Sequence, residues 1–76
     1  MELEFSFNGI DYVVYQENFN EVYVNYSLCR EWILRERTDR GRVLAGKFHI
    51  PAHKSGQDVI DHITEILSND PDRWDD

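Results

Sequence analysis

The asparagine–glycine pair at positions 8 and 9 constrains the fold of this chain more than any other short segment. Asn-Gly is the preferred pair for a two-residue type I′ turn, and the alternating segments LEFSF and IDYVV flank it. We expect a β-hairpin with the pairs Phe7–Ile10, Phe5–Tyr12 and Leu3–Val14. These side chains then share one face of the sheet, and Glu2, Glu4, Ser6 and Asp11 lie on the opposite, wetter face.

Residues 21–28, EVYVNYSL, continue this pattern as a third strand, with Val22, Val24, Tyr26 and Leu28 on one side. The segment that follows has two possible structures. Leu28, Cys29, Trp32 and Ile33 have helical spacing, and Ser27 could cap such a helix. Alternatively, EWILRERT is a strand that returns through a turn into RVLAGKFHI.

The apolar patterns of these two segments favour a second hairpin. A three-residue loop, residues 39–41, with Gly41 in the left-handed conformation pairs Thr38 with Arg42. The same register sets Trp32 opposite Phe48 and Leu34 opposite Gly46, with Leu44 and Ile50 on that apolar face. Pro51 ends the strand because it has no N–H to donate to a neighbouring strand.

A C-terminal helix is predicted to begin at Ser55, in the capping-box-like segment SGQD, and to end near Ser68 and Asn69. Its apolar stripe consists of Val59, Ile60, Ile63, Ile66 and Leu67. The sequence therefore predicts an α+β fold, in which an antiparallel sheet of four to five strands (two β-hairpins plus a connecting strand) packs one C-terminal helix on one face. Residues 1–69 would form this single domain, and residues 70–76 an acidic C-terminal tail.

The cellular compartment is inferred from the cysteine content and from the apolar segments. Cys29 is the only cysteine in the 76 residues, which excludes an internal disulfide and is typical of a reducing compartment. The N-terminal segment lacks the basic and apolar regions of a signal peptide, and no run approaches the ~18 apolar residues of a membrane span. We therefore expect a cytoplasmic protein that makes no membrane contact.

A basic segment interrupts an otherwise acidic chain. The formal net charge is -7, yet residues 30–54 carry seven basic and three acidic side chains. In the register above, Arg35, Arg37 and Lys47 project from the face opposite Trp32, and Arg40 and Arg42 lie at the tip of the hairpin. This basic hairpin is either an electropositive finger that contacts phosphate or an acidic protein, or a solvated face that Glu2, Glu4 and Asp11 neutralise.

Acidic side chains dominate the C-terminal third of the chain. Asp58, Asp61 and Glu65 line the outer side of the predicted helix, and the tail adds four aspartates. Such a row could imitate a nucleic-acid backbone, but a solvated helix face with a solubilising tail is the simpler interpretation. Trp74 within the tail is a candidate docking anchor, because Trp is enriched at binding hot spots. It could equally pack against its own sheet.

No group of residues in the sequence predicts catalysis or metal binding. His49 and His53 are separated by Pro51 and cannot share a helical face, and adding His62 and Cys29 matches no established zinc spacing. Cys29 has no recognisable His/Asn arrangement that would make it a nucleophile. We expect neither an enzyme nor a cofactor.

These features together favour a small non-catalytic protein-interaction module. Its expected surface is the helix-free face of the sheet, where Tyr15, Tyr23 and Ile33 would lie beside Arg35 and Arg37, a Tyr and Arg mixture that interfaces favour. Self-association as a homodimer, through an edge strand or through this face, is a variant of the same hypothesis.

In size and class alone, the chain resembles small acidic accessory proteins of phages and mobile elements. Some of these proteins inhibit host machinery by covering a surface, so the resemblance implies an inhibitor that binds a host protein. The alternative is a nucleic-acid-associated protein that uses the basic hairpin 35–42. The net negative charge counts against duplex binding, which normally depends on phosphate neutralisation.

Overall fold

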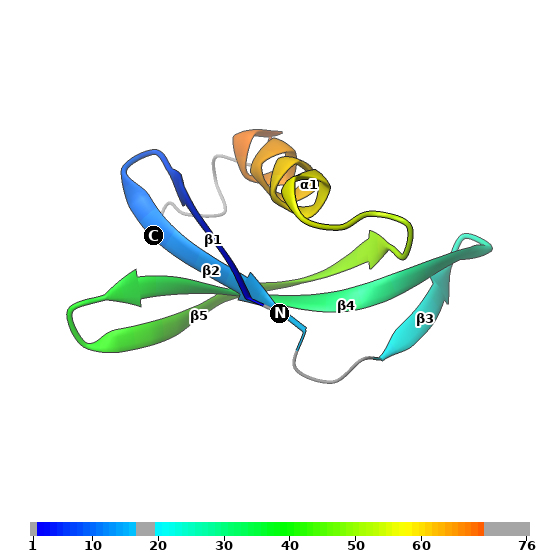
Figure 1. Cartoon of the computed structure of the whole chain (residues 1–76), viewed down its shortest axis with the longest axis horizontal. Coiled ribbons are helices and arrows are strands. Elements are labelled where there is room, and N and C mark those ends of the chain that lie inside the picture. The colour runs from blue at the N-terminus through cyan, green and yellow to red at the C-terminus, as the bar shows by residue number, and fades with distance from the viewer. Residues whose placement is uncertain (1, 17–19, 70–76) are drawn as a thin grey trace.

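The described part of the chain forms a five-stranded antiparallel sheet with one helix across its face (Figure 1). The computed structural model describes residues 2–16 and 20–69. The elements follow in the order β1 (Glu2–Phe7), β2 (Ile10–Tyr15), β3 (Glu21–Val24), β4 (Ser27–Thr38), β5 (Gly41–Pro51) and α1 (Gln57–Asn69). The predicted α+β fold class is confirmed. Trp74 and the rest of the predicted tail lie outside the described residues.

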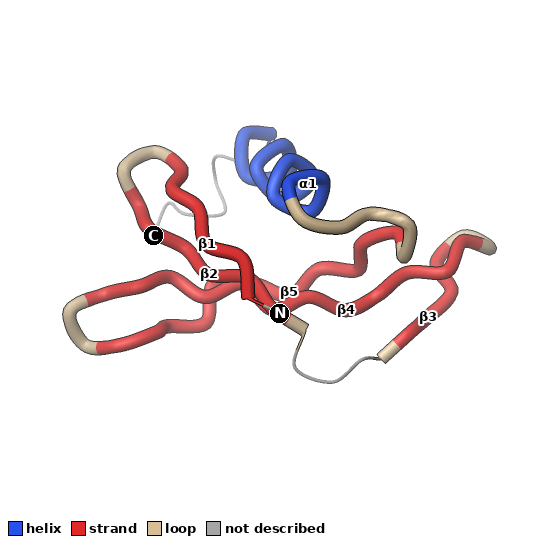
Figure 2. Tube along the Cα trace, viewed as in Figure 1, coloured by secondary structure: helices blue, strands red, loops and turns tan. Residues whose placement is uncertain are grey.

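β4 is the central strand of the sheet (Figure 2). One edge of β4 pairs with β5, and the other edge pairs with β3 along residues 27–30 and with β2 along residues 33–36. β2 and β3 therefore lie end to end beside β4, and β1 is added beyond β2. The segment 28–36, for which helix and strand were both open, is a strand that is paired on both edges.

The N-terminal hairpin has the predicted register. Phe7 pairs with Ile10, Phe5 with Tyr12 and Leu3 with Val14. The two turn residues, Asn8 and Gly9, have φ angles of 52° and 78°, as a type I′ turn requires. The rings of Phe5 and Tyr12 stack with their centroids 5.3 Å apart.

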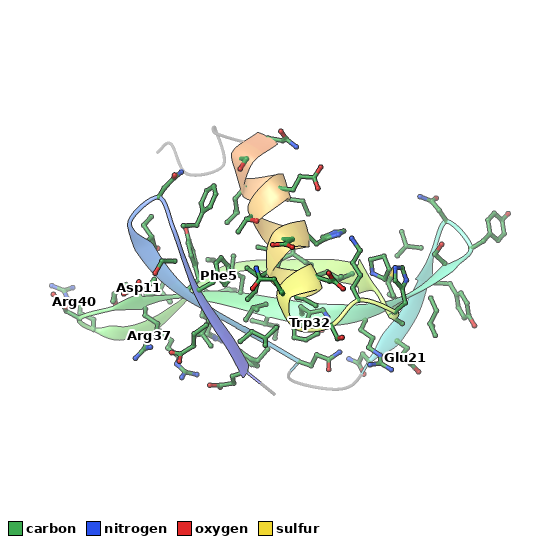
Figure 3. All side chains as sticks on the ribbon, turned by 45° about the horizontal axis from the view of Figure 1, so that its top comes forward. Phe5, Asp11, Glu21, Trp32, Arg37 and Arg40 are labelled. Atoms are coloured by element: carbon green, nitrogen blue, oxygen red, sulfur yellow. The ribbon has the colours of Figure 1, made fainter. Side chains whose placement is uncertain are left out.

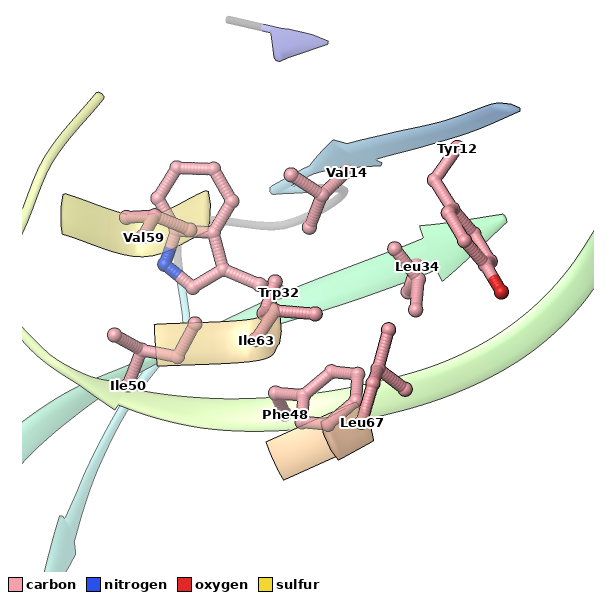
Figure 4. Close-up of a cluster of buried hydrophobic side chains, with 9 residues drawn as sticks. All are labelled: Tyr12, Val14, Trp32, Leu34, Phe48, Ile50, Val59, Ile63 and Leu67. Carbon is pink, nitrogen blue, oxygen red and sulfur yellow. The ribbon is translucent and has the colours of Figure 1, made fainter. Parts of the chain in front are cut away.

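The hydrophobic core lies between the sheet and α1 (Figure 4). The sheet contributes Tyr12, Val14, Trp32, Leu34, Phe48 and Ile50, and α1 contributes Val59, Ile63 and Leu67. The three helix residues are spaced by four, so they form one stripe that faces the sheet. Among the described residues, no helix is long and apolar enough to cross a membrane.

The start of α1 differs from the prediction. The helix begins at Gln57 rather than at Ser55. Gly56 precedes it with a φ of 56°, a left-handed conformation that a right-handed helix cannot contain. The carbonyls of Ser55 and Gly56 nevertheless accept hydrogen bonds from the N–H groups of Asp58 and Val59, each at 3.1 Å.

The second hairpin is confirmed over most of its length. Trp32 lies opposite Phe48 and Leu34 opposite Gly46, as predicted. At the turn, Gly41 has the expected left-handed conformation, with a φ of 109°. The hydroxyl of Thr38 donates to the carbonyl of Gly41 at 2.8 Å, which ties the two strands together at the turn.

The register at the tip of this hairpin was predicted wrongly. Thr38 pairs with Gly41 rather than with Arg42, because a β-bulge at Ala45 adds one residue to β5. The bulge sets Leu44 opposite Arg35 and therefore on the helix-free face. Leu44 is 59% exposed, so its predicted place in the core is wrong.

Residues 21–28 do not form the single strand that was predicted. β3 ends at Val24, and Asn25 and Tyr26 form a turn with φ angles of 50° and 66°. These angles are typical of a type I′ turn, which reverses the chain. Val24 consequently pairs with Ser27, and the side chain of Tyr26 does not align with those of Val22 and Val24.

One contact between titratable groups ties the segment before α1 to the helix. The Nζ atom of Lys54 lies 3.2 Å from Nδ1 of His62, and a neutral imidazole can accept a hydrogen bond there. Burial, together with the positive charge of Lys54, lowers the pKa of His62 below its ordinary value of 6.5, although Glu65 opposes this shift.

We expect His62 to make the fold less stable in acid. The unfolded state binds a proton to His62 more readily than the folded state does, so the free energy of unfolding rises as the pH rises towards 6.5. The destabilisation by His62 is absent above that pH, and it reaches its full size below the pKa that His62 has in the folded state. Urea unfolding from about pH 5 to pH 7.5 should show a smaller pH dependence for His62→Gln than for the wild type. Parallel pH profiles of the two proteins would contradict this account.

Candidate interaction surfaces

The basic side chains of the second hairpin lie on the helix-free face, as predicted. Arg35 lies opposite Val13, and Lys47 lies opposite Ile33, which alternates with the core residues of β4. Figure 3 shows Arg40 at the far end of the hairpin, with Arg37 between it and the body of the protein. Arginine side chains are therefore gathered towards one end of the molecule.

Carboxylates of β1 neutralise two of these arginines. Arg42 donates hydrogen bonds from its two Nη atoms to the carboxylate of Glu2 at 2.9 and 3.2 Å, and Arg37 forms an ion pair with Glu4. The hydrogen bonds from Arg42 lower the pKa of Glu2, and the same contact raises the pKa of Arg42. Asp11, the third expected neutralising residue, instead accepts a hydrogen bond from the Ser6 hydroxyl at 2.6 Å.

The centre of the helix-free face is also internally paired. Arg35 Nε donates to the Tyr15 hydroxyl at 2.8 Å. Val13 and Ile33, their neighbours in the sheet, are 0% and 4% exposed. Ile33 is therefore not the surface residue that the sequence predicted. Further along the face, the carboxylate of Glu31 lies 3.9 Å from Lys47 Nζ and 3.7 Å from His49 Nε2.

The predicted surface residues do not form one patch. Tyr23 pairs with Leu28, whose side chain points to the same side of β4 as Trp32. Tyr23 therefore lies on the helix side of the sheet, and its expected place on the helix-free face is wrong. Tyr15 contacts Arg35 on the helix-free face, whereas Tyr23 belongs to β3, which lies at one end of the molecule (Figure 1).

A second surface, which the sequence did not reveal, surrounds the β3–β4 turn. We call it the hairpin end, and it consists of Val22, Tyr23, Val24, Tyr26 and Leu28. All four residues of β3 are exposed, with the Tyr23 side chain at 76%. Tyr23 and Leu28 face the helix side and Val22 and Val24 face the opposite side, so the exposed apolar residues cover both faces of this two-stranded end. Exposed apolar residues that gather in one region mark interaction sites more often than scattered ones do.

Tyr26 occupies an unusual position within the hairpin end. Its φ of 66° lies in the left-handed region, which costs a non-glycine residue roughly 1–2 kcal/mol. Glycine is the preferred residue at this position of a type I′ turn. The Tyr26 side chain is fully exposed, at 101%, so no packing within the chain offsets that cost.

The described residues offer little for small-molecule or metal chemistry. A shallow pocket of about 320 Å³ is lined by Glu4, Phe5, Ser6, Asp11, Tyr12 and Arg37. Its polar groups already contact one another through the Arg37–Glu4 and Ser6–Asp11 pairs. Within residues 2–16 and 20–69, no group of three or more His, Cys, Asp or Glu side chains could hold a metal ion. Cys29 is a buried free thiol.

Function must therefore be inferred from the geometry of these two ends, the basic tip and the apolar hairpin end. Comparison of the chain with protein-family models, with curated proteins and with solved structures finds no match.

Proposed function

We propose that this protein is a small non-catalytic protein-interaction module that binds its partner through the hairpin end. The observation that carries the proposal is Tyr26, which is held in a left-handed conformation with its ring fully in solvent. Residues with backbone strain of this kind cluster at active sites and ligand-binding sites. Tyr is also among the residues that contribute most binding energy at interfaces.

The surroundings of Tyr26 suit a protein partner. The apolar side chains of the hairpin end adjoin one charged pair, in which Arg30 Nε lies 3.6 Å from the Glu21 carboxylate. A partner that covers Tyr23 and Tyr26 would therefore bury aromatic surface with little desolvation of charge. An inhibitor that covers a host protein, as the resemblance in class implies, could use this surface.

Affinity capture from a lysate of the source cells, with nuclease present, tests the proposal. Three tagged baits are needed: the wild type, a hairpin-end variant (Tyr23→Ser with Tyr26→Gly) and a basic-tip control (Arg37→Gln with Arg42→Gln). We expect one protein to be retained by the wild type and by the control and to be lost from the hairpin-end variant. Equal retention by all three baits, or retained material that disappears with nuclease, would refute the proposal.

A nucleic-acid-associated role for the basic hairpin 35–42 is the second candidate. The position of Arg40 at the exposed tip favours it (Figure 3). The contacts of Arg37 and Arg42 with Glu4 and Glu2 count against it, because these arginines must first leave their carboxylates.

Replacing Glu2 and Glu4 with glutamine tests whether these carboxylates prevent Arg37 and Arg42 from binding nucleic acid. If the carboxylates mask the arginines, the double variant should bind a mixed-sequence DNA duplex more tightly than the wild type. The slope of log affinity against log salt should steepen by about two, since each additional phosphate contact contributes roughly -0.9. Fluorescence anisotropy at several salt concentrations measures this slope. A wild type that binds as tightly as the variant would show that the arginines are already available.

A further inference from the structure

We infer that the hairpin end binds a second copy of this chain, with β3 of one copy paired antiparallel to β3 of the other. The inference rests on the proposed function, because it assigns the partner of the same surface. It follows from how the three outer edges of the sheet differ and from the symmetry that a β3 pair would obey.

β3 is the outer edge with the least protection against pairing. β1 carries Glu2 and Glu4, and β5 carries Arg42, Lys47 and a β-bulge at Ala45. Charges and bulges of this kind hinder edge-to-edge association of sheets. β3 carries one charge, Glu21, which is fewer than on either of the other two edges; like Glu2 and Glu4 it is paired, in its case with Arg30 at 3.6 Å. Its short length, four residues, is the remaining protection.

The backbone of β3 leaves hydrogen-bonding groups directed outward. Val24 and Ser27 flank the two-residue turn and pair with each other. In an antiparallel ladder the next pair, Tyr23 and Leu28, directs its N–H and C=O groups away from the partner strand. The free edge of β3 therefore presents the donor and acceptor of Tyr23 to an incoming strand.

Two-fold symmetry limits the possible registers. When the two-fold axis is perpendicular to the sheet, the same face of both copies points in the same direction. Residues paired across the interface must then lie on the same face, and neighbouring residues of a strand alternate between faces. One residue of β3 must therefore pair with its own copy, and the axis passes between these two. An axis beside Tyr23 sets Val22 opposite Val24 of the second copy and Glu21 opposite its Asn25. An axis beside Val22 sets Glu21 opposite Tyr23 of the second copy. Neither register sets Glu21 opposite its own copy, so no like charges face each other.

The position of β3 in the sheet determines where the body of a second copy would lie. β2 and β3 lie end to end along one edge of β4. An antiparallel second copy would extend past the Asn25–Tyr26 turn, away from β1 and β2. Figure 1 shows this turn at one end of the molecule, beyond α1 and far from the β4–β5 turn.

The charge of the chain predicts how the dimer responds to salt. Two copies that each carry -7 repel one another, and salt screens this repulsion. A short β3 pair buries less than a standard interface, so we expect a dissociation constant on the order of 10–100 μM that falls as salt is added. Binding through the basic tip would respond to salt in the opposite direction.

Sedimentation equilibrium at two salt concentrations tests the inference. Tyr23→Glu faces its own copy in the first register and Glu21 of the second copy in the other, so it sets like charges opposite each other in both. Asn69→Glu makes the same charge change on the exposed end of α1. Wild type and Asn69→Glu should dimerise as concentration rises, and Tyr23→Glu should associate at least tenfold more weakly. Circular dichroism confirms that each variant is folded. A wild type that stays monomeric, or a Tyr23→Glu variant that dimerises like the wild type, would overturn the inference.

Disulfide trapping provides a second readout that does not depend on lost binding. Because Val22 pairs with Cys29 within the chain, the substitutions are made in a Cys29→Ser background, which prevents an intrachain disulfide. In that background, Tyr23→Cys or Val22→Cys should form a cross-linked dimer under mild oxidation, according to the residue that lies on the axis. Glu65→Cys, on the outer side of α1, should not. If the wild type is monomeric and the hairpin-end variant loses a different captured protein, this inference fails and the proposed function stands. If substitutions at the hairpin end change neither association nor capture, both fail.

Discussion

Replacing Tyr26 with glycine is expected to stabilise the free protein by about 0.5–1 kcal/mol and to weaken its complex about thirtyfold. The gain in stability arises because glycine adopts the left-handed conformation without the roughly 1–2 kcal/mol that it costs a non-glycine residue. Part of this gain is lost, because an unfolded glycine has more conformational entropy to give up on folding. Tyr26 is fully exposed, so the free protein loses no packing. The loss of binding corresponds to about 2 kcal/mol, the usual threshold for a hot spot.

Urea unfolding and titration of the complex measure the two effects separately. Tyr26→Phe is the matched control, because it keeps the ring in the same backbone conformation and should leave both values close to those of the wild type. Opposite changes in stability and binding are the signature of a residue kept for function. A glycine variant that binds as tightly as the wild type would remove Tyr26 from the contact surface.

Ile63→Ala is expected to lower the free energy of unfolding by about 2–5 kcal/mol. Ile63 is fully buried at the middle of the stripe that joins α1 to the sheet (Figure 4). A chain of 76 residues has a total stability of roughly 4–11 kcal/mol, so this single substitution removes a large part of it. Equilibrium urea unfolding, followed by circular dichroism, measures the change.

Glu65→Ala serves as the control for Ile63→Ala. It shortens an exposed side chain two positions away on the same helix and should change stability by less than about 0.5 kcal/mol. Equal effects of the two substitutions would mean that α1 does not pack on the sheet through the stripe of Val59, Ile63 and Leu67.

The parts of the fold that were predicted correctly are those with explicit local signals. Asn8-Gly9 dictates its own turn, and the alternation on both sides fixes one register. In the second hairpin, the apolar patterns of two arms agree on the Trp32–Phe48 pair. The helix follows from its apolar stripe, and only its first turn differs, because Gly56 is left-handed.

The errors have local physical causes. Tyr26 continues the apolar alternation of Val22 and Val24, so a turn there has no sequence signal except Asn25, which tolerates a positive φ. The exposed hairpin end depends on that turn, and it was therefore missed. The bulge at Ala45 likewise shifts the register by one residue and moves Leu44 out of the core. Its only sequence signal is the neighbouring Gly46, since an isolated glycine inside a strand often marks a bulge.

The neutralisation of the basic hairpin was one of two interpretations open from the sequence. The contacts of Arg42 with Glu2 and of Arg37 with Glu4 depend on strand order, because β1 is separated from β4 by β2. Sequence patterns predict pairs within a hairpin, but they do not determine how two hairpins lie side by side. The charge was therefore predictable, and its partners on β1 were not.

Amide hydrogen exchange of the free protein and of its complex tests the central claim most directly. The complex is formed with the captured protein or, at high concentration, with a second copy. If the hairpin end is the contact surface, exchange at Tyr23 and its neighbours in β3 should slow on binding, and residues 38–41 at the basic tip should be unchanged. Protection of residues 38–41 with β3 unchanged would contradict the account and assign binding to the arginines.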